Sequence, residues 1–299
     1  MNSVSIIIAT TCQASRSKSL LRAIGSVLGQ ENVRSEVIVV VNGEGYDHEL
    51  FDCLNKNNQL KVVYRREANV SLARYEGVGH VTSEYFGFLD DDDEYLHHSL
   101  SRRVNEMEGD ADIDVIVTNG YVHKGTDKLL VGDILQNKIE QNLVLSFFDV
   151  NWFSSSSSLF RRRTVSQRVF EFDFKYFEWT YLFCQLIIEK KNIKYCDAVT
   201  YRIHVNNSCS ASKSEAYSLA QPEFLLELYQ LPLKKEIKVK IKKKYQTSLN
   251  VISAYYLDNN KRKEAVRFHV RCLRNGGWGY ITYTRKLLFN GKRQFKNAP

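Results

Sequence analysis

The sequence predicts an α/β fold in which a mostly parallel, doubly wound sheet is flanked by helices and followed by a helical C-terminal extension. Short apolar runs alternate with helical periodicity over about the first 120 residues, an alternation that is typical of parallel sheets. From about residue 214 onward the pattern is almost wholly helical and basic. With 299 residues, 43% of them hydrophobic, the chain is long enough to bury a sizeable core. We therefore expect two domains, 1–213 and 214–299.

Five short apolar runs are the predicted strands of the first domain. Most of their successive side chains are apolar, which indicates burial on both faces of the sheet. The runs lie at residues 4–10, 36–41, 60–64, 85–89 and 114–118. Between them, apolar residues repeat at helical spacing in 20–28 and 71–80.

The pattern after residue 118 is less regular. Helices are expected at 142–148 and 179–189, an extended segment at 154–160 and a strand at 198–203. The C-terminal helices are expected at 216–229, 234–257, 261–273 and 280–289.

Composition argues against a membrane-spanning, secreted or disulfide-stabilised protein. The longest apolar runs are far shorter than the roughly 20 residues that a helix needs to cross a bilayer. The N-terminal apolar run is short and has no basic segment before it, so we do not expect a signal peptide. The six cysteines are scattered without a CxxC pair. A reduced, cytoplasmic protein without a disulfide framework or zinc site is therefore expected.

Four adjacent aspartates, Asp90–Asp93, follow the predicted strand at 85–89. Ligands of parallel sheets bind at the carboxyl ends of the strands, so we expect Thr10 and Asn42 to lie near these carboxylates. Like charges at this spacing repel one another, and their oxygens suit Mg²⁺ or Mn²⁺ bridged to a diphosphate. The alternative is a solvated acidic loop or the N-terminus of a helix, where Asp is also favoured.

Three segments together resemble family 2 glycosyltransferases of the GT-A type. The first is the opening VSIIIAT, in which Ala9 stands where the family has proline. The second is the start of the helix at 71–80, with Asn69, Ser71, Ala73 and Arg74. The third is FLDDDD at residues 88–93. The resemblance covers about residues 3–210 and implies a nucleotide-sugar donor.

The resemblance also implies roles for individual residues. Asp90 is expected near the donor ribose, Asp92 as the metal ligand, and Asp93 as their support. The expected donor-binding residues are Thr10, Asn42, Arg74, Asp90, Asp91 and Arg202. Many relatives carry an acid at the end of the second strand, where this chain has Val41 and Asn42. The Asn42 amide can still hydrogen-bond a base.

Glu178 is the predicted catalytic base. It precedes Trp179 in a segment that resembles the family's Glu-Asp-Trp-x-Leu stretch, with Phe177 in place of the first acid. An inverting transfer needs a base to take the proton from the acceptor hydroxyl. The alternative is that Glu178 only favours the N-terminus of its helix.

The segment after the last predicted strand resembles the family's Arg-x-His-x-x-x-Ser stretch, at residues 202–208. The resemblance implies that His204 helps to hold the metal or the diphosphate and that Arg202 pairs with a phosphate. The alternative for His204 is a surface or capping residue. The serines at 154–158, together with Arg161, resemble the family's acceptor-side segment, and we expect them to form a wall of the site.

Charge is distributed unevenly along the chain. Residues 216–299 carry 18 Lys or Arg and 5 Asp or Glu, a net charge of +13, which leaves −5 of the total of +8 for the first 215 residues. Seven lysines crowd residues 234–244 among apolar residues at helical spacing. Such a helix suits an anionic membrane surface. The alternatives are an ordinary solvated helical face and nucleic acid, for which the chain has no signature beyond its charge.

We therefore expect an inverting, metal-dependent glycosyltransferase that moves a sugar, UDP-linked by the family's usage, to a glycan or lipid-linked glycan acceptor. Surface polysaccharide synthesis at the inner face of the membrane is the expected setting. Two rivals stay open: a non-catalytic nucleotide-binding scaffold and a nucleotidyltransferase. The second usually needs a Gly-rich phosphate loop after the first strand, and residues 10–17 contain no glycine.

Overall fold

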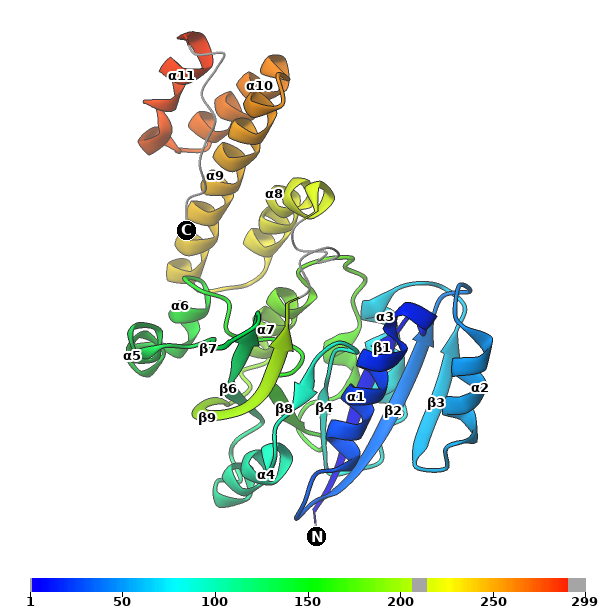
Figure 1. Ribbon diagram of the computed structural model, residues 1–299. Helices are drawn as coiled ribbons and strands as arrows, with labels where there is room; N and C mark the ends of the chain where they lie inside the picture. The colour runs from blue at the N-terminus through cyan, green and yellow to red at the C-terminus, as the bar shows by residue number, and fades with distance from the viewer. Residues whose placement is uncertain (1, 206–213, 290–299) are drawn as a thin grey trace. The chain divides into compact units, whose positions relative to one another are not determined.

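The computed structural model describes residues 2–205 and 214–289. The chain divides into two compact units, Met1–Asn207 and Ser208–Pro299 (Figure 1). The predicted domain boundary, between residues 213 and 214, falls at the end of a segment, 206–213, that is outside the described residues. Residues 206–208 of the predicted Arg-x-His-x-x-x-Ser stretch lie in that segment as well.

The first unit is built around one mixed sheet, with the strand order β3-β2-β1-β4-β8-β6-β9-β5 and with β7 paired to β6. The strands of its first half are parallel: β1 (Ser3–Thr10), β2 (Arg34–Asn42), β3 (Leu60–Arg65) and β4 (Tyr85–Phe88). The strands of its second half are β5 (Glu94–Tyr95), β6 (Val115–His123), β7 (Asp127–Leu129), β8 (Ser158–Arg161) and β9 (Ile193–His204).

The sheet contains more antiparallel pairs than its sequence pattern predicts. Strand β8 runs antiparallel between β4 and β6, and β5 and β7 also pair antiparallel with β9 and β6. Only β6 and β9 are parallel in this half. The predicted α/β class is confirmed, whereas the insertion of β8 depends on a pairing between distant segments that a local pattern does not contain.

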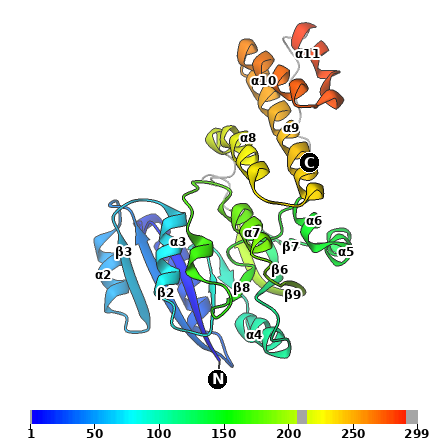
Figure 2. The same cartoon turned by 180° about the vertical axis from the view of Figure 1, so that it is seen from behind.

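Helices cover both faces of the sheet. In Figure 1 helices α1 (Ser17–Leu28) and α2 (His48–Lys56) lie in front of the first strands, and Figure 2 shows α3 (Val70–Gly79) on the other side. The alternation of side chains along β1 fits this arrangement, because Ile6 and Ile8 join the core cluster that contains the buried residues of α1. Ile7 faces α3, where Gly77 allows close approach: a Cβ atom there would lie 2.5 Å from Ile7.

The remaining helices of the first unit are α4 (Ser99–Gly109), α5 (Asp133–Gln141), α6 (Leu143–Phe147) and α7 (Glu178–Ile188). Short 3-10 turns occur at η1 (Ala14–Arg16) and η2 (Gln167–Phe170). Aromatic rings fill the space between β4, β8 and α7, with Phe86 stacked on Phe160 at 5.1 Å and Phe88 5.4 Å from Trp179. This packing fixes the start of α7, which carries the predicted base.

The second unit is helical, as predicted. It contains α8 (Glu215–Gln230), α9 (Lys235–Asp258), α10 (Arg262–Arg274), the turn η4 (Trp278–Tyr280) and α11 (Tyr283–Phe289). One face of α9 is buried through Ile237, Ile241 and Tyr245. Helix α10 packs against α9, where Tyr256 stacks on Phe268 with ring centroids 5.6 Å apart.

Candidate functional site

The candidate site lies at the carboxyl ends of β1, β2 and β4, where the acidic run Asp90–Asp93 turns from β4 into β5. The polar residues that end β1 and β2 meet there. Asn42 Nδ2 donates a hydrogen bond of 3.0 Å to the carbonyl oxygen of Thr10. Thr10 Oγ1 in turn donates to Asp91 Oδ2 at 2.6 Å. The structure thus brings Thr10, Asn42 and the acidic run together, as the parallel-strand pattern predicts.

Asp90 is connected to the predicted base by a single arginine. Arg74 on α3 donates from Nη2 to Asp90 Oδ1 and from Nη1 to Glu178 Oε1, each at 2.8 Å. The Arg74 side chain is only 10% exposed, and its guanidinium carbon lies 5.0 Å from the ring centroid of Trp179. Because one guanidinium on α3 contacts both the acidic run and the first residue of α7, the three predicted residues form one compact group.

Asp91 is held inside the fold. Besides the bond from Thr10, it accepts hydrogen bonds from Arg16, one of them from Nε to Oδ2 at 2.9 Å and the other from Nη2. Its side chain is 6% exposed. These contacts join the loop after β1 to the acidic run, and they leave Asp91 with little surface for a ligand.

Asp92 is the more accessible carboxylate. Its side chain is 36% exposed and lies 3.2 Å from Arg16 Nη2, and its backbone oxygen accepts a hydrogen bond from Arg22 on α1. Burial and the neighbouring Asp90 carboxylate raise the pKa of Asp92, against the opposing effect of Arg16. Negative charge at Asp92 is therefore incompletely compensated by protein groups alone.

Asp93 turns into the core. It accepts hydrogen bonds from Ser156 Oγ at 2.9 Å and from the backbone N–H of His204 at 3.2 Å. Burial first, and then the charges of Asp90 and Asp92, raise the pKa of Asp93 well above its ordinary value. Asp93 thereby ties the acidic run to β9, which agrees with a supporting role.

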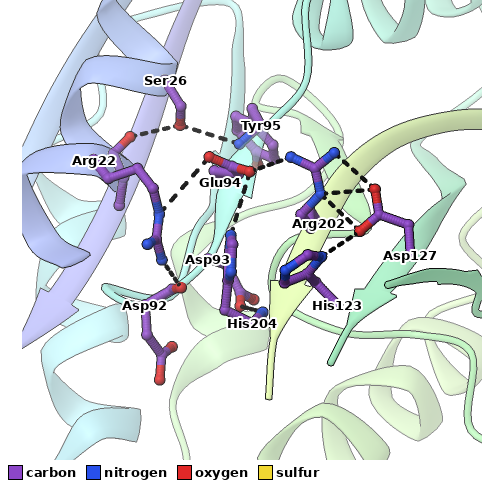
Figure 3. Close-up of polar contacts among 11 residues, drawn as sticks. Arg22, Ser26, Asp92, Asp93, Glu94, Tyr95, His123, Asp127, Arg202 and His204 are labelled. Carbon is purple, nitrogen blue, oxygen red and sulfur yellow. Dashed lines mark hydrogen bonds and ion pairs between the residues drawn. The ribbon is translucent and has the colours of Figure 1, made fainter. Parts of the chain in front are cut away.

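Glu94 continues the acidic run and connects it to β9 (Figure 3). Its carboxylate forms an ion pair with Arg202 and lies 3.7 Å from Arg22 Nε and 3.3 Å from His204 Nε2. Burial alone would raise the pKa of Glu94, but the contacts with Arg202 and His204 outweigh it and lower this pKa. Arg202 also donates to Asp127 on β7, so two carboxylates engage its guanidinium.

The serines at 154–158 and Arg161 do not line a surface as a group. Ser155–Ser158 and Arg161 are buried, and Arg161 donates to the backbone oxygens of Ile113 and Met107. Only Ser156 reaches the acidic run, through Asp93. In the structure this segment is buried, supports the acidic run through Ser156, and does not form the predicted wall.

A divalent cation fits this site only in part. Within 2–205 and 214–289, no group of three or more His, Cys, Asp and Glu side chains is arranged to hold a metal ion. Asp92 and His204 are not paired: the Asp92 carboxylate points away from the imidazole, which faces Glu94 (Figure 3). Although His204 Nε2 is buried, no partner in the described part of the chain gives it a well-directed hydrogen bond.

The residue that does suit a cation is Asp92. Its carboxylate is accessible, and partial burial together with the charge of Asp90 disfavours its ionised form until a cation is bound. Mg²⁺ commonly takes one or two carboxylates and completes its sphere with substrate phosphates and water. The site therefore fits a metal ion held by Asp92 and by the ligand, and it does not contain a protein cage.

Four functional candidates were absent from the sequence prediction: Arg16, Arg22, Glu94 and Asp127. A signal existed for Glu94, because it directly follows the four aspartates. Arg16 lies in the polar loop after the first strand, a position that faces the ligand edge in parallel sheets. Arg22 and Asp127 were not singled out, because the contacts that join them to the site, with Asp92 and Arg202, span 70 or more residues of sequence.

Comparisons with known proteins agree on one family. A family model described as glycosyl transferase family 2 matches residues 5–170. A protein of Nostoc sp., described as an uncharacterized glycosyltransferase, is 26% identical over 221 residues, which cover 70% of this chain and 68% of that protein.

Solved structures of S. aureus TarS are similar in fold. TarS 1–349 in complex with UDP-GlcNAc has a TM-score of 0.62 at 14% identity, covering 91% of this chain and 79% of that one. The same TarS region in complex with UDP has a TM-score of 0.54 at 15% identity, covering 83% and 71%. The likeness confirms the predicted GT-A type of α/β fold.

Proposed function

Because the chain belongs to glycosyl transferase family 2 and is a glycosyltransferase, we propose that it moves a sugar from a nucleoside-diphosphate sugar, with UDP as the nucleotide, to an acceptor hydroxyl with inversion. The observation that carries this proposal is the Arg74 bridge between Asp90 and Glu178. The buried guanidinium of Arg74 contacts both a carboxylate of the acidic run and the candidate base. Donor and acceptor chemistry need such groups within one site.

On the donor side, Thr10 and Asn42 lie at the strand ends beside the acidic run. The fold shared with TarS, which was crystallised with UDP and UDP-GlcNAc, supports a UDP-sugar donor. The Asn42 amide donates through Nδ2 to Thr10, which orients its oxygen as an acceptor for a base N–H. Arg202 is engaged by Glu94 and Asp127, so in our proposal it supports the site and contacts a phosphate only if one of them is displaced.

On the acceptor side, Glu178 accepts the proton of the attacking hydroxyl. Arg74 and the packing of Trp179 hold its carboxylate at the start of α7. The hydroxyl oxygen then attacks the anomeric carbon from the face opposite the leaving nucleoside diphosphate, which inverts the configuration. General bases of this kind contribute roughly 10²- to 10⁴-fold to the rate.

Mg²⁺ or Mn²⁺ is the cofactor that we propose, with Asp92 as its protein ligand. When bound, such an ion supplies neutralisation of the charge that develops on the departing diphosphate. Arg16 holds the neighbouring Asp91 and contacts Asp92, so it orders the carboxylates of this region. His204 would need to turn away from Glu94 to take part.

For the acceptor we propose a glycan or lipid-linked glycan of surface polysaccharide synthesis, reached by a protein at the cytoplasmic face of the membrane. No helix in the part of the chain that the structure describes is long and apolar enough to cross a bilayer. The basic face of α9, opposite the buried Ile237 and Ile241, supports binding to anionic lipid headgroups.

The experiment that tests the donor site is a thermal-shift panel of nucleoside diphosphates and nucleotide sugars, with and without Mn²⁺. A ligand of the folded state raises the melting temperature by mass action, so no acceptor need be known. We expect a Mn²⁺-dependent shift with UDP and UDP-sugars, followed by release of UDP on turnover. The absence of a shift with every nucleotide would contradict the proposal, and release of pyrophosphate would indicate a nucleotidyltransferase.

A further inference from the structure

A row of charged and imidazole side chains crosses four neighbouring strands beside the acidic run (Figure 3). Glu94 on β5 is the register partner of Arg202 on β9, and His204 on β9 is the register partner of His123 on β6. His123 is in turn the partner of Asp127 on β7. Side chains in register on adjacent strands lie close together, so the pairing of the sheet itself assembles this row.

The outer end of the row is fixed by Asp127. Its carboxylate accepts from Arg202 Nη2 at 2.8 Å and from Arg202 Nε at 3.1 Å, and it lies 2.6 Å from His123 Nδ1. The remaining guanidinium nitrogen, Nη1, donates to Glu94. Arg202 therefore has one orientation that satisfies both carboxylates, because its planar fork cannot rotate without losing one of them.

At its other end, the row is connected to the acidic run through Glu94. Glu94 contacts Arg22, which donates to the backbone oxygen of Asp92. Glu94 also lies 3.3 Å from His204 Nε2, while the backbone N–H of His204 donates to Asp93. The position of Glu94 is thus coupled both to the backbone of the acidic run and to the imidazole beside it.

We propose that Asp127 is a positioning residue for the donor site: through Arg202 it fixes Glu94, and through Glu94 it fixes the turn that presents Asp90 and Asp92. Asp127 itself contacts neither Asp90 nor Asp92. The part of this proposal that concerns ligand binding rests on the proposed function, whereas the part that concerns the geometry of the turn does not.

A test needs a variant that removes the contacts of Asp127 with Arg202 and His123, and a matched control that removes an unrelated ion pair. Asp127→Ala is the first, and the 30% exposure of this side chain makes a folded variant expected. Glu106→Ala is the control, because it removes the 2.9 Å pair with Lys194 on the same strand as Arg202. Asp127→Glu keeps the charge and tests rescue, and Arg202→Lys keeps a cation that lacks the planar fork of the guanidinium.

The first readout is hydrogen–deuterium exchange of peptides that span residues 90–96 in the ligand-free protein. We expect faster exchange there in Asp127→Ala and Arg202→Lys, and wild-type exchange in Glu106→Ala. Unchanged exchange in Asp127→Ala, or equal acceleration in the control, would overturn the proposal, since the first shows no coupling and the second shows general loosening.

The second readout is the affinity for UDP measured with Mn²⁺ present. We expect Asp127→Ala to bind UDP about 10-fold more weakly, as is common for residues that support a metal or phosphate site, with recovery in Asp127→Glu. Wild-type affinity in an Asp127→Ala protein with faster exchange would remove the link to the donor site. If the wild-type protein binds no nucleotide, the proposed function fails, while the exchange measurement still decides the positioning role.

Discussion

Arg74 and Glu178 form a 2.8 Å ion pair in which the predicted base is held by the same guanidinium that holds Asp90. Arg74 lies in the middle of α3, and Glu178 is the first residue of α7. Asn69 supports this junction by accepting the Leu72 N–H, and Ser71 by donating to the backbone oxygen of Phe174 at 2.7 Å. The motif at the start of α3 therefore positions the loop that leads to the base.

Replacing the base tests its role directly. We expect Glu178→Gln to lower transfer by roughly 10²-fold or more, because an amide cannot accept the acceptor's proton. Binding of UDP should change little, since Arg74 retains Asp90. The measurement is UDP release at saturating donor, together with the Kd for UDP. Wild-type turnover in Glu178→Gln would exclude Glu178 as the base.

Asp92 and Asp91 should behave differently despite being neighbours. We expect Asp92→Asn to remove the Mn²⁺-dependent part of UDP binding, because its accessible carboxylate is the proposed metal ligand. The fold should keep nearly its wild-type melting temperature, since the side chain is 36% exposed. Calorimetric titration of UDP with and without Mn²⁺ measures the effect, and Asp52→Asn on α2 is an exposed control. Full Mn²⁺ dependence in Asp92→Asn would assign the metal elsewhere.

Thr10 should matter for stability. Its hydroxyl donates to the buried Asp91 at 2.6 Å and accepts from the Cys12 N–H at 3.0 Å. Thr10→Val keeps the shape but leaves both partners without this contact, so we expect a loss of about 1–3 kcal/mol in the free energy of unfolding. Urea denaturation followed by circular dichroism measures it, with Thr10→Ser as the variant that retains the hydroxyl. A loss in Thr10→Ser without a loss in Thr10→Val would indicate that the methyl group, and not the hydroxyl, stabilises this site.

The predicted elements that the structure reproduces are those whose signal is local. Strand β1 and helix α7 lie within one or two residues of the predicted 4–10 and 179–189, because burial of successive or periodic side chains is visible in a short window. The family pattern also located Arg74, Glu178 and the acidic run, which the fold does bring together.

Roles within the site are less accessible to sequence reasoning. Asp91 and Asp92 are identical neighbours, and only the course of the turn decides that one faces Thr10 while the other is exposed. Arg202 shows the same limit, because its partner Asp127 lies in a three-residue strand whose side chains are all exposed and carry no apolar pattern. Non-local pairings of this kind determine which charges are free to bind a ligand.

The lysines of α9 provide the last test. Lys235, Lys242 and Lys243 are exposed, on a helix whose other face is buried through Ile237, Ile241 and Tyr245. Each lysine near an anionic surface contributes roughly 1 kcal/mol, so replacing these three by Gln should weaken binding to vesicles that contain anionic lipid by about 100-fold. Cosedimentation at physiological salt measures the partition.

The matched control for this test changes the same amount of charge in the other unit. Lys18, Lys56 and Lys61 are exposed in Met1–Asn207, and their replacement by Gln lowers the net charge equally. If membrane attraction depended only on total charge, both triple variants would lose the same affinity. Selective loss in the α9 variant is what a membrane-facing helix requires. Equal loss, or no loss in either, would leave these lysines as a solvated helical face.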